Sequence, residues 1–379
     1  MKHVLFYDDN PDFGGHQFMA MRGVAAANRC SKFRTTFVLN PQNERLLAHT
    51  DVIQQEGGKL TVHHSPTVTK KFQALRNHVS GKSLDDLVRL FNALKPDLVV
   101  CLQGEIEDSS LALLAARKAG CRVMSYIPVA HTMQQMGAKL GALRDRTTGY
   151  LFRTPDCWMT ISQCIADMLR MRGATAPIHI VENGIDTMRF VPRDGTALRR
   201  EQGLPEGLLF GVCGRVEFNQ KQQDFLIRAM SRWSEELAQA HLLVVGDGPD
   251  YERLKDIIAE VGLRDRISLR AWEQRPEMLY PTLDCLIIPS RFEGFPLVML
   301  EAAACGIPIV GSDNDGMHDF LPTPWRFAQG DESGLVRALQ AAINQPEDQV
   351  ARQRQTVLEN HTLQQFEDRF VEALLQELP

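Results

Sequence analysis

The stretch DCLIIPSRFEGFPLVMLEAAACGIPIVGS, residues 284–312, contains a complete strand–helix–strand unit. Its two ends, 284–290 and 307–312, are short apolar runs of the kind that form strands buried on both faces of a parallel sheet. Between them, residues 297–305 favour a helix, with Pro296 at its first position and Gly306 at its end. Glu293 and Glu301 interrupt this apolar stretch, and packing alone requires neither carboxylate.

The same alternation of strands and helices continues on both sides of this unit. Apolar runs such as LVVCL before Gln103 and LLFGVCG before Arg215 are each followed by a helical pattern. Two such series predict two doubly wound, Rossmann-like α/β domains. The periodicity lapses near ENGIDTMRFVPRDG, so we predict domains over residues 1–185 and 186–360 and an amphipathic helix within 361–379.

The composition favours a globular cytoplasmic protein. The chain is 44% hydrophobic and 23% charged, and no run approaches the ~18 apolar residues of a membrane span. The amino terminus turns acidic at once, unlike a secretory signal. The eight cysteines include no C-x-x-C pair, which favours reduced thiols rather than disulfides.

Charge is divided unevenly along the chain. Residues 1–190 have 23 basic and 17 acidic side chains, a net of +6, whereas residues 191–379 have 19 and 30, a net of −11. The basic half suits an anionic partner, and we expect peripheral contact with the inner face of a membrane. Solvated helix faces account equally well for an excess of this size.

The loop at residues 291–296 is a candidate ligand site. Open α/β sheets bind ligands at the carboxyl ends of their strands, and a helix N-terminus there suits phosphate. A carboxylate repels phosphate but accepts hydrogen bonds from hydroxyls, such as those of a nucleotide sugar on both sides of its diphosphate. In the alternative interpretation, Glu293 only complements the helix dipole and Glu301 is only solvated.

Several motifs in order resemble the retaining glycosyltransferases of the GT-B architecture, family 4 type, which includes bacterial lipopolysaccharide, capsule and exopolysaccharide enzymes. The segment from Glu293 to Val310 resembles their Glu-x7-Glu motif. VENGIDTMRFVP at 181–192 resembles the linker into their second domain, and GVCGRVEFNQKQQDFLIRAM at 211–230 resembles their phosphate-binding segment. VVGDGPDYERLK at 244–255 and FGGHQ at 13–17 match further motifs.

The resemblance implies two domains facing a cleft, the last helix crossing back to the first domain, and a role for particular residues. Predicted catalytic residues are Arg215 and Lys221, which would stabilise the leaving diphosphate, together with Glu293 and His131. Predicted donor-binding residues are Gly294, Phe295, Pro296, Leu297 and Glu301. A lone histidine such as His131 also suits a purely structural role.

Acceptor contact is expected from the first domain. Gly14 and Gly15 lie in the first strand-to-helix turn, where a glycine pair allows close approach of a ligand. A turn that merely needs unusual dihedral angles explains them equally well. Gln103, Gly104 and Glu105 follow another strand and are predicted to face the same cleft.

The predicted activity is transfer of a hexose-type sugar, with retention, from a UDP- or GDP-sugar to a glycan or lipid-linked glycan. The aspartates of DDNPD and SDNDG lie in turns, so we predict no metal and no cofactor. A nucleotide-sugar 2-epimerase and a non-catalytic sugar-nucleotide binding protein are the alternatives. The family often has a glycine pair where this chain has Asp315 and Gly316, which leaves the geometry of the donor loop open.

Overall fold

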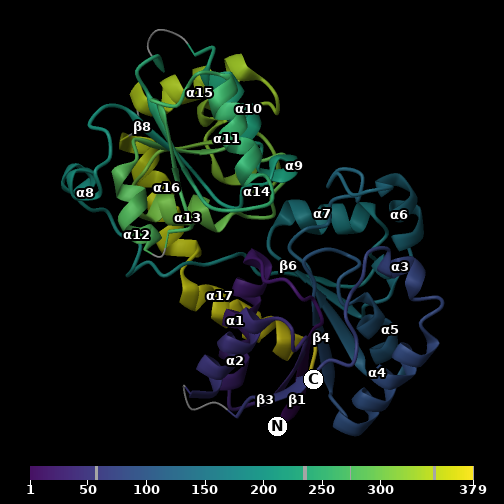
Figure 1. Ribbon diagram of the computed structural model, residues 1–379. Coiled ribbons are helices and arrows are strands. Elements are labelled where there is room, and N and C mark those ends of the chain that lie inside the picture. Colours follow the sequence, from purple (N-terminus) through teal and green to yellow (C-terminus); the bar gives the residue numbers. More distant parts are fainter. Residues whose placement is uncertain (56–58, 234–236, 274, 345–346, 379) are drawn as a thin grey trace. The chain divides into compact units, whose positions relative to one another are not determined.

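The computed structural model describes residues 1–55, 59–233, 237–273, 275–344 and 347–378. It divides into two compact units, one of residues 1–183 with 364–379 and one of residues 184–363. Each unit is built on one parallel sheet with helices on both faces, which confirms the predicted doubly wound α/β class (Figure 1). No helix in the described ranges is both long and apolar enough to cross a membrane.

The first unit contains a seven-stranded parallel sheet of order β3-β2-β1-β4-β5-β6-β7. Its strands are β1 (Lys2–Asp8), β2 (Phe33–Leu39), β3 (Thr61–His64), β4 (Leu98–Leu102), β5 (Arg122–Tyr126), β6 (Cys157–Thr160) and β7 (Ile178–Ile180). Its helices are α1 (Gly15–Arg29), α2 (Glu44–Gln55), α3 (Gln73–Arg76), α4 (Gly81–Leu94), α5 (Ser110–Lys118), α6 (Gly141–Thr148), η1 (Leu151–Arg153), α7 (Gln163–Met171) and α17 (Leu363–Gln376).

Alternate residues of β1 face opposite helix layers, as the period of a strand requires. Leu5 and Tyr7 belong to a buried cluster with side chains of α4 and α5. Phe6 faces the other way, and its ring centroid lies 6.3 Å from that of Phe370 in α17. A Cβ on Gly23 of α1 would lie 2.5 Å from the Phe370 ring, so this glycine makes room for the last helix.

The second unit contains a six-stranded parallel sheet of order β10-β9-β8-β11-β12-β13. Its strands are β8 (Leu209–Cys213), β9 (His241–Val245), β10 (Ile267–Arg270), β11 (Cys285–Ile288), β12 (Ile309–Ser312) and β13 (Arg326–Phe327). Its helices are α8 (Gly195–Gln202), α9 (Phe218–Lys221), α10 (Gln223–Met230), α11 (Tyr251–Glu260), α12 (Pro276–Leu279), η3 (Tyr280–Thr282), α13 (Leu297–Ala304), α14 (Asp315–Phe320), η4 (Thr323–Trp325), α15 (Glu332–Asn344) and α16 (Glu347–Asn360).

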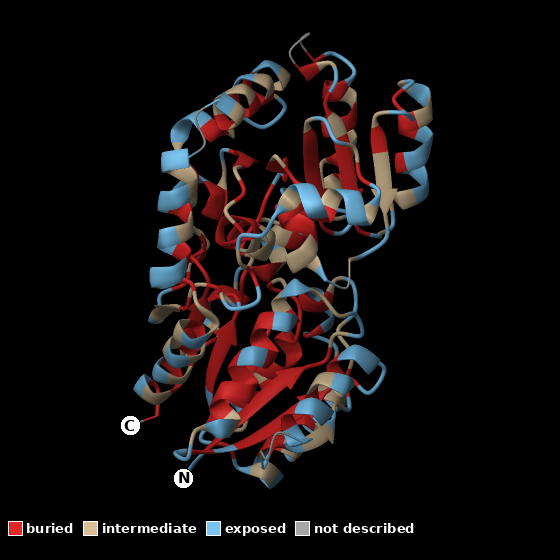
Figure 2. Cartoon of the chain, turned by 90° about the vertical axis from the view of Figure 1, so that its left-hand side faces the viewer, coloured by how far each residue is buried: buried red, intermediate tan, exposed pale blue. Residues whose placement is uncertain are grey.

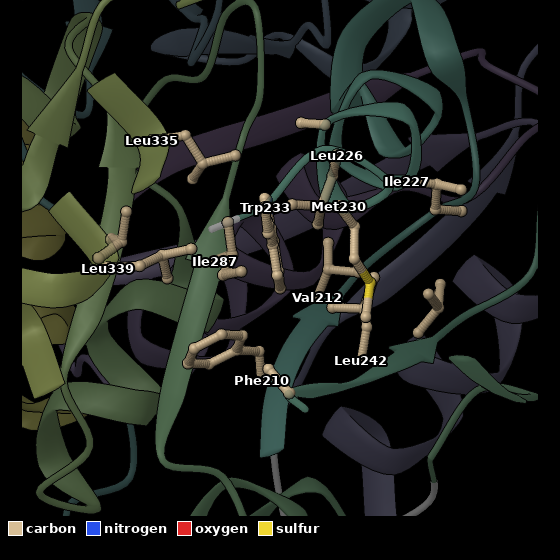
Figure 3. Packing of buried hydrophobic residues seen from close by; sticks show 14 of the residues in the cluster. Phe210, Val212, Leu226, Ile227, Met230, Trp233, Leu242, Ile287, Leu335 and Leu339 are labelled. Carbon is tan, nitrogen blue, oxygen red and sulfur yellow. The ribbon is translucent and has the colours of Figure 1, made fainter. Parts of the chain in front are cut away.

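The core of the second unit lies between its sheet and the helices α10 and α15. Figure 3 shows Phe210, Val212 and Leu242 from the strands pointing toward side chains of those helices, among them Met230 and Leu339. Buried residues concentrate in the strands, while the outer faces of the helices are exposed (Figure 2). The burial of the strands on both faces explains why their sequences are continuously apolar.

The strand–helix–strand unit at 284–312 forms as predicted, with one correction at the helix start. β11 pairs in parallel with β12, with Leu286 opposite Ile309. Pro296 has an extended ψ of 129° and is the N-cap of α13, so the first helical residue is Leu297. Proline still suits this position, because a residue without an N–H loses no helical hydrogen bond there. Gly306, with φ +77°, follows the helix in the left-handed region.

Candidate active site

The second unit has a topological switch point between β8 and β11, which are neighbours in the sheet although two strands separate them in sequence. In doubly wound sheets, the loops that follow such strands diverge and leave a ligand-binding crevice at their carboxyl ends. Here those loops are residues 214–217 and 289–296, which contain most of the predicted donor-side residues. Sheet order therefore brings two distant motifs to one edge.

The chain that follows β8, the loop and the helix α9, provides the two predicted cations. Lys221 ends α9, and its side chain is mostly buried, with 21% of its surface exposed. The Arg215 side chain is 67% exposed, and its Nε lies 3.6 Å from Glu217 Oε2. The backbone beneath it is fixed more firmly, because Gln223 Nε2 donates to the Arg215 carbonyl at 2.9 Å. Lys221 is therefore held in place, whereas the Arg215 guanidinium extends into solvent.

The loop after β11 brings Glu293 directly to Lys221. The Lys221 Nζ donates to Glu293 Oε1 at 2.5 Å, and Glu293 is buried, with 7% of its surface exposed. Arg291 N donates to the Gln220 carbonyl at 2.7 Å, which ties this loop to α9 through the backbone as well. The sequence predicted both residues but not their pairing with each other.

Asp315 and Gly316, the predicted departure from the family pattern, clamp this loop from the next strand–helix connection. Asp315 Oδ2 accepts a hydrogen bond from the Glu293 N–H at 2.7 Å, and Gly316 N donates to the Gly294 carbonyl at 3.2 Å. A Cβ on Gly316 would lie 2.5 Å from the Phe295 ring. Asp315 has φ +47°, a conformation that favours glycine. From the sequence, Asp315 was predicted only to depart from the family's glycine pair, and its contact with Glu293 was not expected.

The N-terminus of α13 faces the same edge. Gly294, Phe295, Pro296 and Leu297 bring the chain into the helix, and no side chain caps its first turn. The first amides of any helix lack intrahelical partners and have a partial positive charge. The Phe295 ring turns away into a packed cluster, with its centroid 5.1 Å from that of His361. Phe295 therefore supports the loop by packing, and any ligand contact comes from its backbone.

Glu301 lies on the flank of α13, and Tyr280 is its partner. The Tyr280 hydroxyl donates to Glu301 Oε2 at 2.6 Å. Burial raises the pKa of Glu301, while the Tyr280 hydroxyl and Arg189 lower it. Burial raises the pKa of the Cys213 thiol at the carboxyl end of β8, and the Glu301 carboxylate raises it further. No spacing in the sequence pointed to Tyr280.

A small cavity lies between the ends of β8 and β11. Its volume is about 10 Å³, enough for one water molecule, and its polar lining includes Lys221, Gln223 and Ser290. Gln223 is buried, and its Oε1 has no hydrogen-bond partner among the described residues. A water in this cavity would satisfy that oxygen next to the Lys221 ammonium.

The first unit has its own switch point, between β1 and β4. Gly14 is the N-cap of α1, and Gly15 is the first helical residue and is exposed. The Gly14 N–H donates to Gln17 Oε1 at 2.6 Å, and Gln17 Nε2 donates to Asp8 Oδ2 at 2.8 Å. Burial raises the pKa of Asp8 to about 8. The buried Asp8 carboxyl thus holds the Gln17 side chain, which in turn fixes the Gly14 turn.

The loop after β4 corrects one predicted role. Gln103 is fully buried, and its amide donates to the carbonyls of Ile106 and Asp108 at 3.1 and 2.5 Å. It therefore supports the loop, where the sequence predicted acceptor contact. The Glu105 carboxylate lies 3.3 Å from Arg144, and its burial together with the neighbouring carboxylates of Asp108 and Glu107 raises its pKa.

His131 follows β5 in the first unit and is buried, with 6% of its surface exposed. Arg172 Nη1 donates to its carbonyl at 2.7 Å, which fixes the backbone of the loop. His131 and the four acceptor-side residues thus belong to the first unit, and the other predicted site residues belong to the second. Among the described residues, no three His, Cys, Asp or Glu side chains gather as a metal site would require.

Comparison with known proteins gives consistent results. Residues 207–345 match the family model described as glycosyl transferases group 1. The chain is 26% identical over 277 residues to lipopolysaccharide 1,6-galactosyltransferase of Escherichia coli K12, which covers 69% of this chain and 70% of that protein. It is 37% identical over 153 residues to D-inositol 3-phosphate glycosyltransferase of Stackebrandtia nassauensis, but this region spans only 37% of the chain and 34% of the relative.

Solved structures match over the whole chain. HepE of Anabaena in complex with UDP and glucose superposes with a TM-score of 0.79 at 17% identity, covering 99% of this chain and 100% of that one. The apo form of the lipopolysaccharide outer core galactosyltransferase WaaB superposes with a TM-score of 0.72 at 20% identity over 100% of both chains. At these identities the likeness establishes the fold.

Proposed function

We propose that this chain is a GT-B glycosyltransferase of the family 4 type and that it transfers a hexose-type sugar from a nucleoside-diphosphate sugar to a glycan or lipid-linked glycan. The donor we propose is a UDP- or GDP-sugar. Transfer proceeds with retention at the anomeric carbon and without a metal or other cofactor. The setting we propose is polysaccharide or lipopolysaccharide assembly at the cytoplasmic face of a membrane.

One observation carries this proposal: the 2.5 Å pair of Lys221 and Glu293 at the switch point of the second unit. A cation and a carboxylate at this edge, beside the N-terminus of α13, suit a ligand with an anionic group next to hydroxyls. A nucleotide sugar has this chemistry. UDP and UDP-glucose in the solved structures of HepE support the same class of ligand.

In the proposed reaction, the bond between the anomeric carbon and the diphosphate oxygen breaks, and its electron pair stays on the diphosphate. Lys221, the exposed Arg215 and the first amides of α13 stabilise the developing charge. An acceptor hydroxyl attacks the anomeric carbon from the same face, and its proton passes to a diphosphate oxygen. Fixed cations and the helix dipole thereby take the place of a metal ion, and most of the catalysis comes from positioning.

In this proposal the two glutamates accept hydrogen bonds from hydroxyls on the two sides of the diphosphate, the transferred sugar and the ribose. We assign the contact with the transferred sugar to Glu293, and two observations support this role: its N–H donates to Asp315 Oδ2 and its carboxylate accepts from Lys221, so the loop is held firmly. Glu301 is assigned to the ribose diol. Its Oε2 accepts from the Tyr280 hydroxyl, and its Oε1 would accept from the ribose. On the acceptor side, the turn of Gly14 and Gly15, with Glu105, offers the backbone and polar groups for a glycan, while His131 keeps its predicted catalytic role.

A thermal-shift panel with UDP, GDP, ADP, CMP and dTDP tests the donor assignment. A nucleotide at about 100 times its Kd should stabilise the protein by about 2.7 kcal/mol. We expect Lys221→Ala to lose this shift and Lys255→Ala to retain it, because Lys255 is an exposed lysine on α11 that pairs with Glu252 and Tyr251 of the same helix. No stabilisation by any nucleotide in the unmodified protein would refute the proposal. Sugar conversion without an acceptor would instead indicate an epimerase.

A further inference from the structure

A larger cavity of the second unit lies between α15 and the chain that leads through η4 into β13. Its volume is about 400 Å³, within the range of about 300–1,000 Å³ in which proteins bind small molecules. Its lining residues lie between positions 323 and 341, outside the loops 214–217 and 289–296 of the candidate active site. The cavity is therefore a separate candidate site of the same unit.

Small residues on one face of α15 form the helical wall of this cavity. Leu335 points into the core of the unit (Figure 3). Gly334, Ala338 and Ala341 line the cavity instead, and their helical spacing places them on one face. A Cβ on Gly334 would lie 2.4 Å from Asp331 Oδ2, so this position requires glycine. Larger side chains on this face would fill the space that the cavity occupies.

Polar side chains on both walls use only part of their hydrogen-bonding capacity. Arg326 Nη2 donates to Thr323 Oγ1 at 2.8 Å, but the buried Nε of Arg326 has no partner within the described part of the chain. A hydroxyl that accepts can still donate, so Thr323 remains available to a ligand. On the other wall, Arg337 Nη2 lies 3.4 Å from Asp331 Oδ2, and the Arg337 side chain is 69% exposed. Its guanidinium therefore has further N–H donors for a ligand.

The charges around the cavity are balanced. Arg326 pairs with Asp313 at 2.7 Å, and Arg337 pairs with Asp331. A phosphate group is bound by cations in excess, and the Asp331 carboxylate would repel it. A carboxylate beside a guanidinium instead offers an acceptor next to a donor, which neighbouring hydroxyls of a sugar ring can satisfy together. Apolar surface for the C–H groups of such a ring comes from Pro324, Ala338 and Ala341.

We propose that this cavity binds a pyranose sugar unit, which Asp331, Arg337 and Thr323 hold through its hydroxyls. A purely apolar ligand would leave these polar groups without water or partners, at a cost in free energy. Occupied by one unit of a glycan, the site would keep that chain on the protein. The proposal goes beyond the proposed function, because transfer at Lys221 and Glu293 requires no second sugar site.

NMR of alanine methyl groups in the full chain tests the proposal at the cavity itself. The protein is titrated in turn with the methyl α-glycosides of glucose, galactose and mannose. We expect the methyl signals of Ala338 and Ala341 to shift and saturate with at least one of them, with a Kd on the order of 1 mM for so small a ligand. The methyl signal of Ala351, an exposed residue of α16 outside the cavity, should stay in place.

Two variants perturb the site by different means. Arg337→Ala should raise the Kd about tenfold or more, because a hydrogen bond from a charged group is lost. Ala341→Phe fills the cavity and should abolish the shift of the Ala338 methyl signal. The matched control is Arg228→Ala, which removes an exposed arginine paired at 3.3 Å with Glu260 away from the cavity. It should leave the Kd within about twofold, as for an independent site.

Three results would overturn the proposal: no saturable shift with any of the glycosides, equal weakening in Arg337→Ala and Arg228→Ala, or saturation by inorganic phosphate in preference to the glycosides. Stabilisation by UDP should be the same in Arg337→Ala, Ala341→Phe and the unmodified protein, and its loss in these variants would assign the cavity to the donor site. Because that readout reports the donor site, failure of sugar binding in the cavity is distinguishable from failure of the proposed function.

Discussion

Replacing Asp315 by glycine and by alanine separates a hydrogen bond from the backbone strain that accompanies it. Asp315 accepts the Glu293 N–H at 2.7 Å while its own φ is +47°. Glycine removes both the hydrogen bond and the strain. Alanine removes the hydrogen bond but keeps the strain. The two variants should therefore differ in stability although both lack the carboxylate.

The structure sets the size of these effects. A hydrogen bond to a charged acceptor contributes about 1.5–3 kcal/mol, and Asp315 is buried, so solvent does not replace it. The left-handed conformation costs a residue other than glycine about 1–2 kcal/mol. Asp315→Gly should thus lose about 1 kcal/mol and Asp315→Ala about 2–3 kcal/mol. For a unit of this size, each kcal/mol lowers Tm by about 2–4 °C.

Thermal unfolding and sugar-transfer kinetics measure the two consequences. We expect the order of Tm to be wild type, glycine variant, alanine variant, and kcat to fall in both variants because the Glu293 loop loses its clamp. Asp315→Asn keeps an acceptor oxygen and should retain most of kcat. A glycine variant more stable than wild type, with unchanged kcat, would refute the reasoning, because the hydrogen bond would then contribute less than the strain.

Three further predictions concern other features. Arg215→Ala should lower turnover on the order of 10²-fold with little change in Tm, since its side chain is 67% exposed; wild-type turnover would exclude a catalytic role. Gly23→Ala should destabilise the first unit by about 1–3 kcal/mol because its Cβ would lie 2.5 Å from the Phe370 ring, whereas the control Gly81→Ala meets no atom within 4 Å and should not. Burial raises the pKa of Asp8, so its protonated carboxyl stabilises the fold at pH values below 3.8, the ordinary pKa of an aspartate. This contribution is lost as the pH rises to about 8, the pKa in the folded protein. Asp8→Asn should therefore become more stable relative to wild type across that interval, by up to about 1.4 kcal/mol per pH unit in urea titrations, and a pH-independent difference would contradict the shift.

The sequence predicted the fold because buried parallel strands leave a clear pattern. Apolar runs such as 284–290 and 307–312 must be uninterrupted when both faces of the sheet are covered, and Gly306 marks where a helix ends. Sheet order then follows from the doubly wound class, which is why the predicted loops lie at a switch point. The error at Pro296 is a shift of one residue, within the precision with which helix starts are defined.

The finer contacts of the site could not be predicted in the same way. The bonds between Tyr280 and Glu301 and between Asp315 and Glu293 join residues 21 and 22 positions apart, across loops whose shapes leave no periodic pattern. Gln103 shows the same limit, because a polar residue after a strand suits a ligand contact and an internal support equally well. Such choices depend on which side chains meet in three dimensions.

The position of α17 has a consequence for how the chain folds during synthesis. Phe370 packs against Phe6 and near Tyr126, yet the ribosome adds it after every residue of the second unit. Domains usually fold from the amino end as they emerge. Here the unit made first must keep an apolar face uncovered until α17 has emerged, while the unit made second can finish folding before that. Chaperones should accordingly engage nascent chains that lack α17 more strongly than the released protein.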